Sequence, residues 1–206
     1  MIFTHIPLGL LNVNTYILAD EDSQEGFIID VGGDFDILHR QIQNMGILVQ
    51  KILLTHGHLD HVHASNEARN ILQAPVYIHE SDKELYKDSK IRSLYGQEAI
   101  KHLDIDFLLQ DDDLLTFGRH QIKVIHTPGH TQGSVCFLVD DNFLISGDTL
   151  FRESIGRTDH MGGNKQQEII SIKEKLMPLA DVTEVFPGHG PSTTIGYERQ
   201  YNRYLQ

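Results

Sequence analysis

The sequence predicts an α/β fold whose strands form two sheets. Between residues 51 and 79, a short apolar run, a segment of helical composition and a second apolar run follow one another, an alternation typical of α/β proteins. A second group of strand-like runs begins near residue 107. Side chains that can bind metals recur where the strands end, so we expect these ends to carry the function.

Length and composition favour a single domain over residues 1–206, because 206 residues suffice for one substantial core. No apolar run is long enough to span a bilayer and the N-terminus lacks a secretion signal, so we expect a cytoplasmic protein without a membrane partner. The formal net charge of −12 argues against nucleic acid as a partner. The oligomeric state remains open.

The N-terminal part predicts a hairpin and a helix. Strands are expected at residues 14–19 and 26–31, joined by a polar turn, and a helix at residues 34–45, closed by Gly46. Asp30 lies near the end of the second strand, where it either supports a metal ligand or is a solvated turn residue.

The loop at residues 55–61 concentrates side chains of the kinds that bind metals. It follows an apolar strand at residues 51–55 and precedes a helical segment at residues 62–74. Gly57 allows a sharp turn between two imidazoles. Solvated histidines are the alternative, but so dense a set behind a buried strand favours a metal site. The ligand-type residues of this loop are His56, His58, Asp60 and His61.

The middle of the chain predicts a further strand at residues 74–79 and a polar stretch at residues 81–102, in which we recognise no chemistry. Residues 107–115 and 121–126 are predicted strands of the second sheet. A hairpin is expected at residues 135–146. It contains Cys136, the only cysteine in the sequence, which we interpret as a buried structural thiol.

Three later residues repeat the arrangement of strand, glycine and metal-capable side chain. Each lies in a loop beside glycine, two of them in loops that also contain proline, directly after a predicted strand. A helix at residues 165–176 and a strand at residues 182–186 complete the prediction. The three residues are His130, Asp148 and His189.

Four motifs are the basis for a family resemblance: His56-x-His58-x-Asp60-His61, Pro128-Gly129-His130-Thr131, Ser146-Gly147-Asp148-Thr149 and Pro187-Gly188-His189-Gly190. Together they resemble the metallo-β-lactamase superfamily, and within it the glyoxalase II branch, most closely its short bacterial members. The resemblance covers nearly the whole chain. It implies an αββα sandwich, with two mixed β-sheets flanked by helices and the metals in a cleft at one edge.

The resemblance also implies a role for each ligand. His56, His58 and His130 would hold one metal, and Asp60, His61 and His189 the other, with Asp148 bridging both. Asp30 matches a supporting aspartate of the family. We interpret Asp60 and Asp148 as catalytic residues as well as ligands. Two divalent ions are expected, zinc first, with iron or manganese as alternatives.

Two metals about 3.5–4 Å apart can share a water, lower its pKa and polarise a carbonyl, so no serine or cysteine nucleophile is needed. We therefore expect a dinuclear hydrolase that opens a small-molecule thioester such as S-D-lactoylglutathione with metal-bound hydroxide. The alternative is a persulfide dioxygenase, a mononuclear iron oxidoreductase of the same superfamily.

The sequence departs from the glyoxalase II pattern in ways that concern the substrate. The chain ends soon after His189, so we expect most of the helical glutathione-binding region to be absent. Asp159 stands where the family has a tyrosine, and Gly190-Pro191 replaces a second one. Arg157 is the candidate for binding an anionic substrate group, against the alternative of an intramolecular salt bridge.

Overall fold

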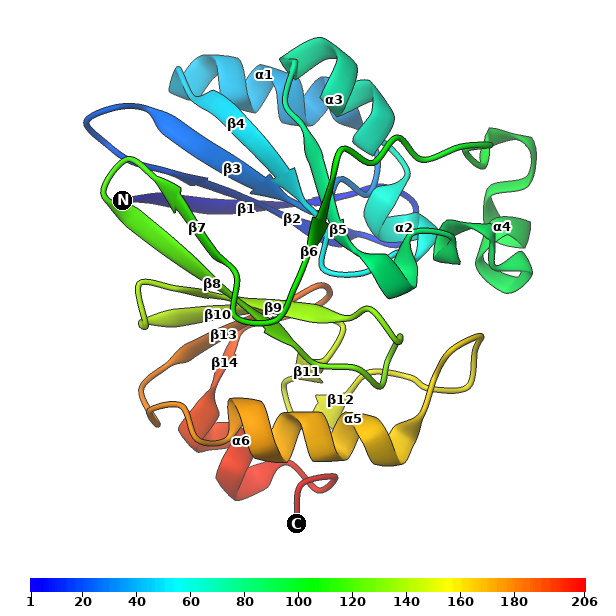
Figure 1. Cartoon of the computed structure of the whole chain (residues 1–206), viewed down its shortest axis with the longest axis vertical. Coiled ribbons are helices and arrows are strands. Elements are labelled where there is room, and N and C mark those ends of the chain that lie inside the picture. The colour runs from blue at the N-terminus through cyan, green and yellow to red at the C-terminus, as the bar shows by residue number, and fades with distance from the viewer.

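The structure is a computed structural model that describes residues 1–88 and 92–206 in full, with residues 89–91 included only in the bounds of a helix. The chain folds into two sheets that pack face to face, with helices on both outer faces (Figure 1). This is the predicted αββα sandwich. Among the described residues, no helix is long and apolar enough to cross a membrane.

The first sheet is mixed. Its first three strands pair antiparallel, and the remaining neighbours pair parallel. In sheet order the strands are β1 (Ile2–Leu8), β2 (Val13–Ala19), β3 (Glu25–Ile29), β4 (Leu48–Leu53), β5 (Val76–His79) and β6 (Phe107–Leu109).

The second sheet is mostly antiparallel, with one parallel pair between β10 and β13. In sheet order the strands are β14 (Thr193–Thr194), β13 (Glu184–Pro187), β10 (Phe143–Gly147), β9 (Val135–Val139), β8 (His120–His126) and β7 (Leu114–Phe117). Two short strands, β11 (Leu150–Phe151) and β12 (Ser154–Ile155), form a separate hairpin.

Helices α1 and α3 cover the first sheet, and α5 and α6 cover the second, as Figure 1 shows. Helices α2 and α4 and three short helical turns lie in connections, and a fourth short helical segment, η4, directly continues α5. The α-helices are α1 (Phe35–Met45), α2 (Leu59–Val62), α3 (Ser65–Leu72), α4 (Ser89–Tyr95), α5 (Lys165–Ser171) and α6 (Ile195–Tyr201). The short turns are η1 (Glu80–Asp82), η2 (Leu85–Lys87), η3 (Gly96–Glu98) and η4 (Ile172–Leu176).

The buried apolar side chains form three layers that match this order. One layer, including Ile28 and Leu38, lies between the first sheet and its helices. The central layer, including Phe27 and Phe137, lies between the sheets, and the third, including Leu144, lies under the C-terminal helices. Because all three layers are apolar, the sheet edges are the natural location for polar chemistry.

Two sequence predictions need correction. Residues 107–115 do not form one strand of the second sheet, because a turn at residues 110–113 divides them. β6 pairs parallel with β5 in the first sheet, and only β7 belongs to the second. The helix expected over residues 62–74 is split, since α2 ends at Val62 and α3 begins at Ser65.

Candidate metal centre

A cleft of about 480 Å³ lies at one edge of the two sheets, where the loops that follow β4, β8, β10 and β13 meet. Five of the predicted ligands line it, and the other two, His56 and His61, are fully buried against them. Loops that are separated by more than a hundred residues in the chain therefore meet at one point. The five lining ligands are His58, Asp60, His130, Asp148 and His189.

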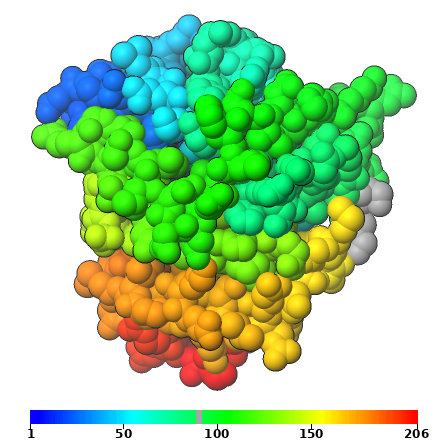
Figure 2. Space-filling model, in the orientation of Figure 1, coloured from blue at the N-terminus to red at the C-terminus, as the bar shows by residue number. Residues whose placement is uncertain are grey.

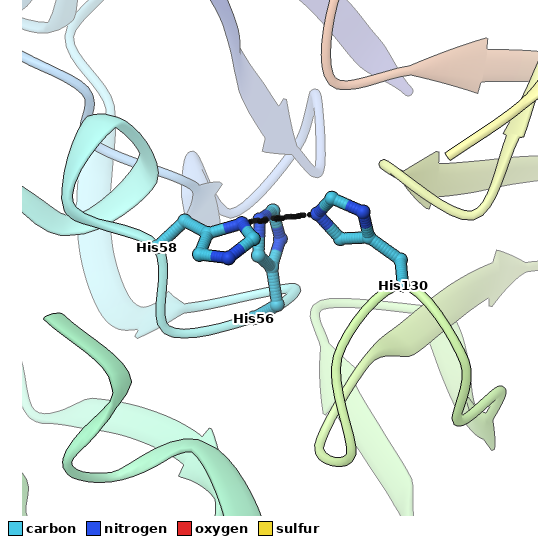
Figure 3. Close-up of side chains that lie close together, drawn as sticks. All are labelled: His56, His58 and His130. Carbon is cyan, nitrogen blue, oxygen red and sulfur yellow. Dashed lines mark hydrogen bonds between the residues drawn. The ribbon is translucent and has the colours of Figure 1, made fainter. Parts of the chain in front are cut away.

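The first cluster consists of three imidazoles, and we call it the three-histidine cluster. The nitrogens His56 Nε2 and His130 Nε2 each lie close to His58 Nδ1, at 3.0 Å in both cases, and 3.3 Å from one another (Figure 3). Three nitrogens on a tetrahedral zinc at its usual bond length would be roughly 3.3 Å apart. The spacing therefore fits one metal ion.

In two of these rings, a hydrogen bond from Nδ1 leaves Nε2 unprotonated and able to bind a metal ion. Thr55 Oγ1 donates to Asp30 Oδ2 at 2.7 Å, so at 3.0 Å it accepts the proton of His56 Nδ1. His130 Nδ1 donates to the Arg157 carbonyl at 2.7 Å. In both rings Nε2 then carries a lone pair directed into the cluster, as a metal ligand requires.

Burial keeps the three imidazoles neutral. It lowers the pKa of His56 and of His58 well below the ordinary value, and the charges of neighbouring histidines add to the effect. Burial also lowers the pKa of His130 to about 4. Neutral imidazole is the form that binds metals, so this cluster has little proton competition near pH 7.

The second cluster is rich in carboxylates, and we call it the carboxylate cluster. Asp60 Oδ2 lies 3.4 Å from His189 Nε2 and 3.7 Å from His61 Nε2. Burial alone would lower the pKa of His61, but the charges of nearby carboxylates, Asp148 first, outweigh it and raise that pKa well above the ordinary value. A bound cation would replace the proton that these carboxylates attract.

Asp148 stands between the clusters and faces both. Its Oδ1 lies 3.4 Å from His61 Nε2, while its Oδ2 lies 3.7 Å from His130 Nε2 and 3.7 Å from His189 Nε2. Although burial opposes it, the surrounding histidines hold the pKa of Asp148 well below its usual range. The carboxylate is thus ionised, and its Oδ2 faces one histidine of each cluster while its Oδ1 faces His61.

Asp30 is a buried support and not a solvated turn residue. It is only 1% exposed, and its Oδ2 accepts a 2.7 Å hydrogen bond from His61 Nδ1. The same oxygen accepts from Thr55 Oγ1, whose own acceptor role orients His56. One carboxylate therefore orients a ring in each cluster.

Asp82 is a support that the sequence analysis missed. It lies in η1, inside the polar stretch in which we recognised no chemistry, and is 1% exposed. Its carboxylate accepts from Gly57 N at 3.0 Å, from Gly133 N at 2.7 Å and from Thr131 Oγ1 at 2.5 Å. It thereby ties the loop of His56 and His58 to the loop of His130.

The polar atoms left over in the site fit metal ions. Within the described residues, Asp60 Oδ1, His61 Nε2 and Asp148 Oδ1 are buried and lack a hydrogen-bond partner. Buried polar atoms without partners are costly, and metal ions together with the water that they bind would satisfy all three. Sets of three possible ligand atoms occur in both clusters, each within 4.8 Å of one another.

The predicted substrate residue Arg157 lines the cleft, but its guanidinium is 82% exposed and already paired. Its Nε and Nη2 donate to the two carboxylate oxygens of Asp159 at 3.0 and 2.9 Å. The intramolecular salt bridge of the alternative interpretation is therefore present, and substrate binding by Arg157 stays a prediction. His160 also lines the cleft, and its ring packs edge to face on His58 with centroids 4.4 Å apart.

Comparison with known families and relatives agrees with this geometry. Residues 8–189 match the model of the metallo-beta-lactamase superfamily. The chain is 36% identical to the probable metallo-hydrolase YqgX of Bacillus subtilis, over 100% of this chain and 98% of the relative. It is 33% identical to hydroxyacylglutathione hydrolase GloC of Haemophilus influenzae, over 97% and 96% respectively.

Solved structures show the same fold. The crystal structure of BLEG-1 B3 metallo-beta-lactamase superposes with a TM-score of 0.90 and 38% identity, covering 99% of both chains. The structure of TTHA1623 in a di-iron-bound form gives a TM-score of 0.86 and 35% identity, covering 98% of this chain and 100% of the other. The second of these holds two irons in a chain of similar length.

Proposed function

The chain belongs to the metallo-beta-lactamase superfamily, and we propose that it is a dinuclear metal-dependent hydrolase of the glyoxalase II type, which cleaves thioesters such as S-D-lactoylglutathione. The observation that carries this proposal is Asp148, whose carboxylate lies between the two clusters and faces histidines of both. Such a bridge is the arrangement expected of a paired metal site.

The ligand chemistry supports hydrolysis without a protein nucleophile. The only cysteine, Cys136, is fully buried, and burial raises the pKa of its thiol to about 11. Histidine and carboxylate ligands suit zinc and do not exclude iron or manganese. When bound, two such ions would acidify a water molecule and polarise the thioester carbonyl.

The protein residues would hold and orient the reactants. Asp148 and Asp60 supply negative charge that offsets the two cations, and Asp60 Oδ1, which lacks a hydrogen-bond partner among the described residues, would accept a hydrogen bond from the attacking water. The thioester would lie in the cleft, with its acyl group and thiol along the walls outside the ligands.

The test combines metal analysis with kinetics on the same preparation. We expect up to two transition-metal ions per chain, hydrolysis of S-D-lactoylglutathione with a high KM, and loss of metals and activity together on chelation. A protein that takes up no transition metal under any reconstitution would contradict the proposal. Oxygen uptake with glutathione persulfide, without thioester hydrolysis, would instead assign a persulfide dioxygenase.

A further inference from the structure

The walls of the cleft outside the ligands are largely apolar. They are formed by the β1–β2 connection, α4, β11 and β12, which contribute Leu11, Leu94, Phe151 and Ile155. Leu94 is 56% exposed and Leu11 is 39% exposed. Large apolar side chains that are exposed beside a functional cleft mark a surface that is covered when a ligand binds.

The apolar wall is assembled from both halves of the chain. The segment that follows β5 and the loop after β12 lie next to one another on the same side of the molecule (Figure 2), and residues of α4 and β12 line the same cleft. A ligand whose reacting carbonyl sits at the histidines would therefore extend outward between Leu94 and the Phe151–Ile155 hairpin. An extended hydrocarbon group can remove more of these side chains from water than a small hydroxyacyl group can.

The charges in the cleft disfavour an anionic thiol. Apart from histidines, Arg157 is the one cationic side chain among the described lining residues, and Asp159 already takes its guanidinium. The remaining charged lining residues are Asp60, Asp148 and Asp159. Bound metal ions would offset Asp60 and Asp148 at the bottom of the cleft, whereas the described residues of the outer wall offer the carboxylates of glutathione only Arg157, which is paired with Asp159.

We propose that the preferred substrates are thioesters of straight-chain apolar acyl groups on an uncharged thiol. This inference rests on the proposed thioester hydrolysis and specifies the substrate class for the same cleft. The acyl chain is recognised by burial against Leu94, Leu11 and Phe151, and the thiol needs no charged group.

The experiment compares acetyl, butanoyl, hexanoyl and octanoyl thioesters of N-acetylcysteamine with S-D-lactoylglutathione on the metal-loaded protein. Each methylene that becomes buried should raise kcat/KM by about twofold to fourfold, until the wall is covered. The hexanoyl ester should then exceed S-D-lactoylglutathione in kcat/KM. Hydrolysis of every ester without a rise along the series, or a clear preference for the glutathione thioester, would overturn the inference while leaving the proposed function intact.

Two variants locate the effect. Leu94→Ser should flatten the rise along the acyl series, whereas the control Leu114→Ser, at an equally exposed leucine on β7 outside the cleft lining, should leave it unchanged. Asp159→Asn removes the charge that holds Arg157 and should raise kcat/KM for S-D-lactoylglutathione by up to about fivefold. A steep series that persists in Leu94→Ser would mean that the wall does not recognise the chain. Failure of all thioesters would contradict the proposed function itself.

Discussion

The three-histidine cluster and the carboxylate cluster share Asp148 but differ in their protonation. In the first, burial lowers the pKa of every imidazole, so the rings are neutral. In the second, carboxylates outweigh burial and raise the pKa of His61, and for His189 the hydrogen bond to Asp60 and the charge of Asp148 do the same. Without a cation, the imidazoles of the first cluster are therefore neutral, whereas histidines of the second cluster hold protons more firmly.

The difference indicates how the two sites would fill. The three-histidine cluster offers neutral lone pairs and needs no proton release, whereas the carboxylate cluster must exchange protons for its cation. His189 also has a more exposed side chain, at 28%, than His56 or His61, which are fully buried. We expect the three-histidine site to retain its metal more firmly, and the following variants test this division.

The largest effect should follow from Asp148→Ala, because it removes an oxygen from both clusters and the charge that lets two dications sit close together. We expect lower occupancy of both metals and a fall in kcat on the order of a thousandfold, with a smaller change in KM. Metal content and kinetics measure this, with circular dichroism as the control for folding. A folded variant that keeps two metals and normal turnover would show that Asp148 does not bridge.

The next pair of variants separates the clusters. His58→Ala should remove the more firmly held metal, while His189→Ala should remove the other and leave the three-histidine site occupied. Because one intact site cannot hold both the water and the carbonyl, each should lower kcat by about a hundredfold. Titration with a chromogenic chelator, following release of each metal, distinguishes them. Identical release profiles for the two variants would contradict the division into a tight and a weak site.

A smaller effect should follow from Asp30→Asn and Asp82→Asn, which change the buried residues that support the ligands. Among the described residues, both carboxylates accept hydrogen bonds on both oxygens. The NH₂ group of an asparagine would therefore replace one acceptor by a donor, and at least one of these hydrogen bonds would be lost. Loss of such a partner typically costs about 10–100-fold in metal affinity. Asp30→Asn should weaken the carboxylate cluster through His61 and disturb His56 less, whereas Asp82→Asn should affect the three-histidine site alone. Equal losses at both sites in Asp82→Asn would refute this assignment.

The seven candidate ligands could be predicted from the sequence because they lie in loops beside strand ends or glycines, and the structure brings them together at one edge of the two sheets. Their roles as metal ligands stay predictions. The αββα layering came from the family resemblance. Neither the sequence pattern nor the resemblance assigned each strand to its sheet. Residues 107–109 and 114–117 have similar composition, but the first segment pairs in one sheet and the second in the other.

Asp82 was not predictable from periodicity, because its partners are backbone amides of Gly57 and Gly133, far away in the chain. One signal was present. Asp82 follows β5, which pairs parallel with β4, the strand that leads into the ligand loop. A carboxylate just beyond the neighbouring parallel strand is a candidate support for the ligand loop.

Besides the candidate ligands, Glu168 is a third buried carboxyl near the centre, after Asp30 and Asp82, and it lies behind the three-histidine cluster. It is fully buried, its Oε1 accepts one 3.0 Å hydrogen bond from Gly156 N, and its Oε2 has no partner among the described residues. Burial raises its pKa to about 9, and the charge of Asp148 adds to this. Unlike Asp30 and Asp82, it is therefore expected to be a neutral acid that orients no ligand.

The smallest effect on activity should accordingly come from Glu168→Gln, which keeps the shape of the side chain and an acceptor for Gly156 N.

The stability of the parent protein should change with pH because of Glu168. The folded protein holds a proton that the unfolded chain, with a glutamate pKa near 4.5, releases first, so the free energy of unfolding should fall as the pH rises from about 4.5 to about 9. Glu168→Gln should remove this slope, matching the parent near pH 4 and exceeding it by on the order of 2–4 kcal/mol at pH 8. Urea denaturation of the metal-free proteins across this range measures it. A variant less stable than the parent at pH 8 would show that Glu168 is ionised in the fold, and the three-histidine side would then tolerate a negative charge as the carboxylate side does.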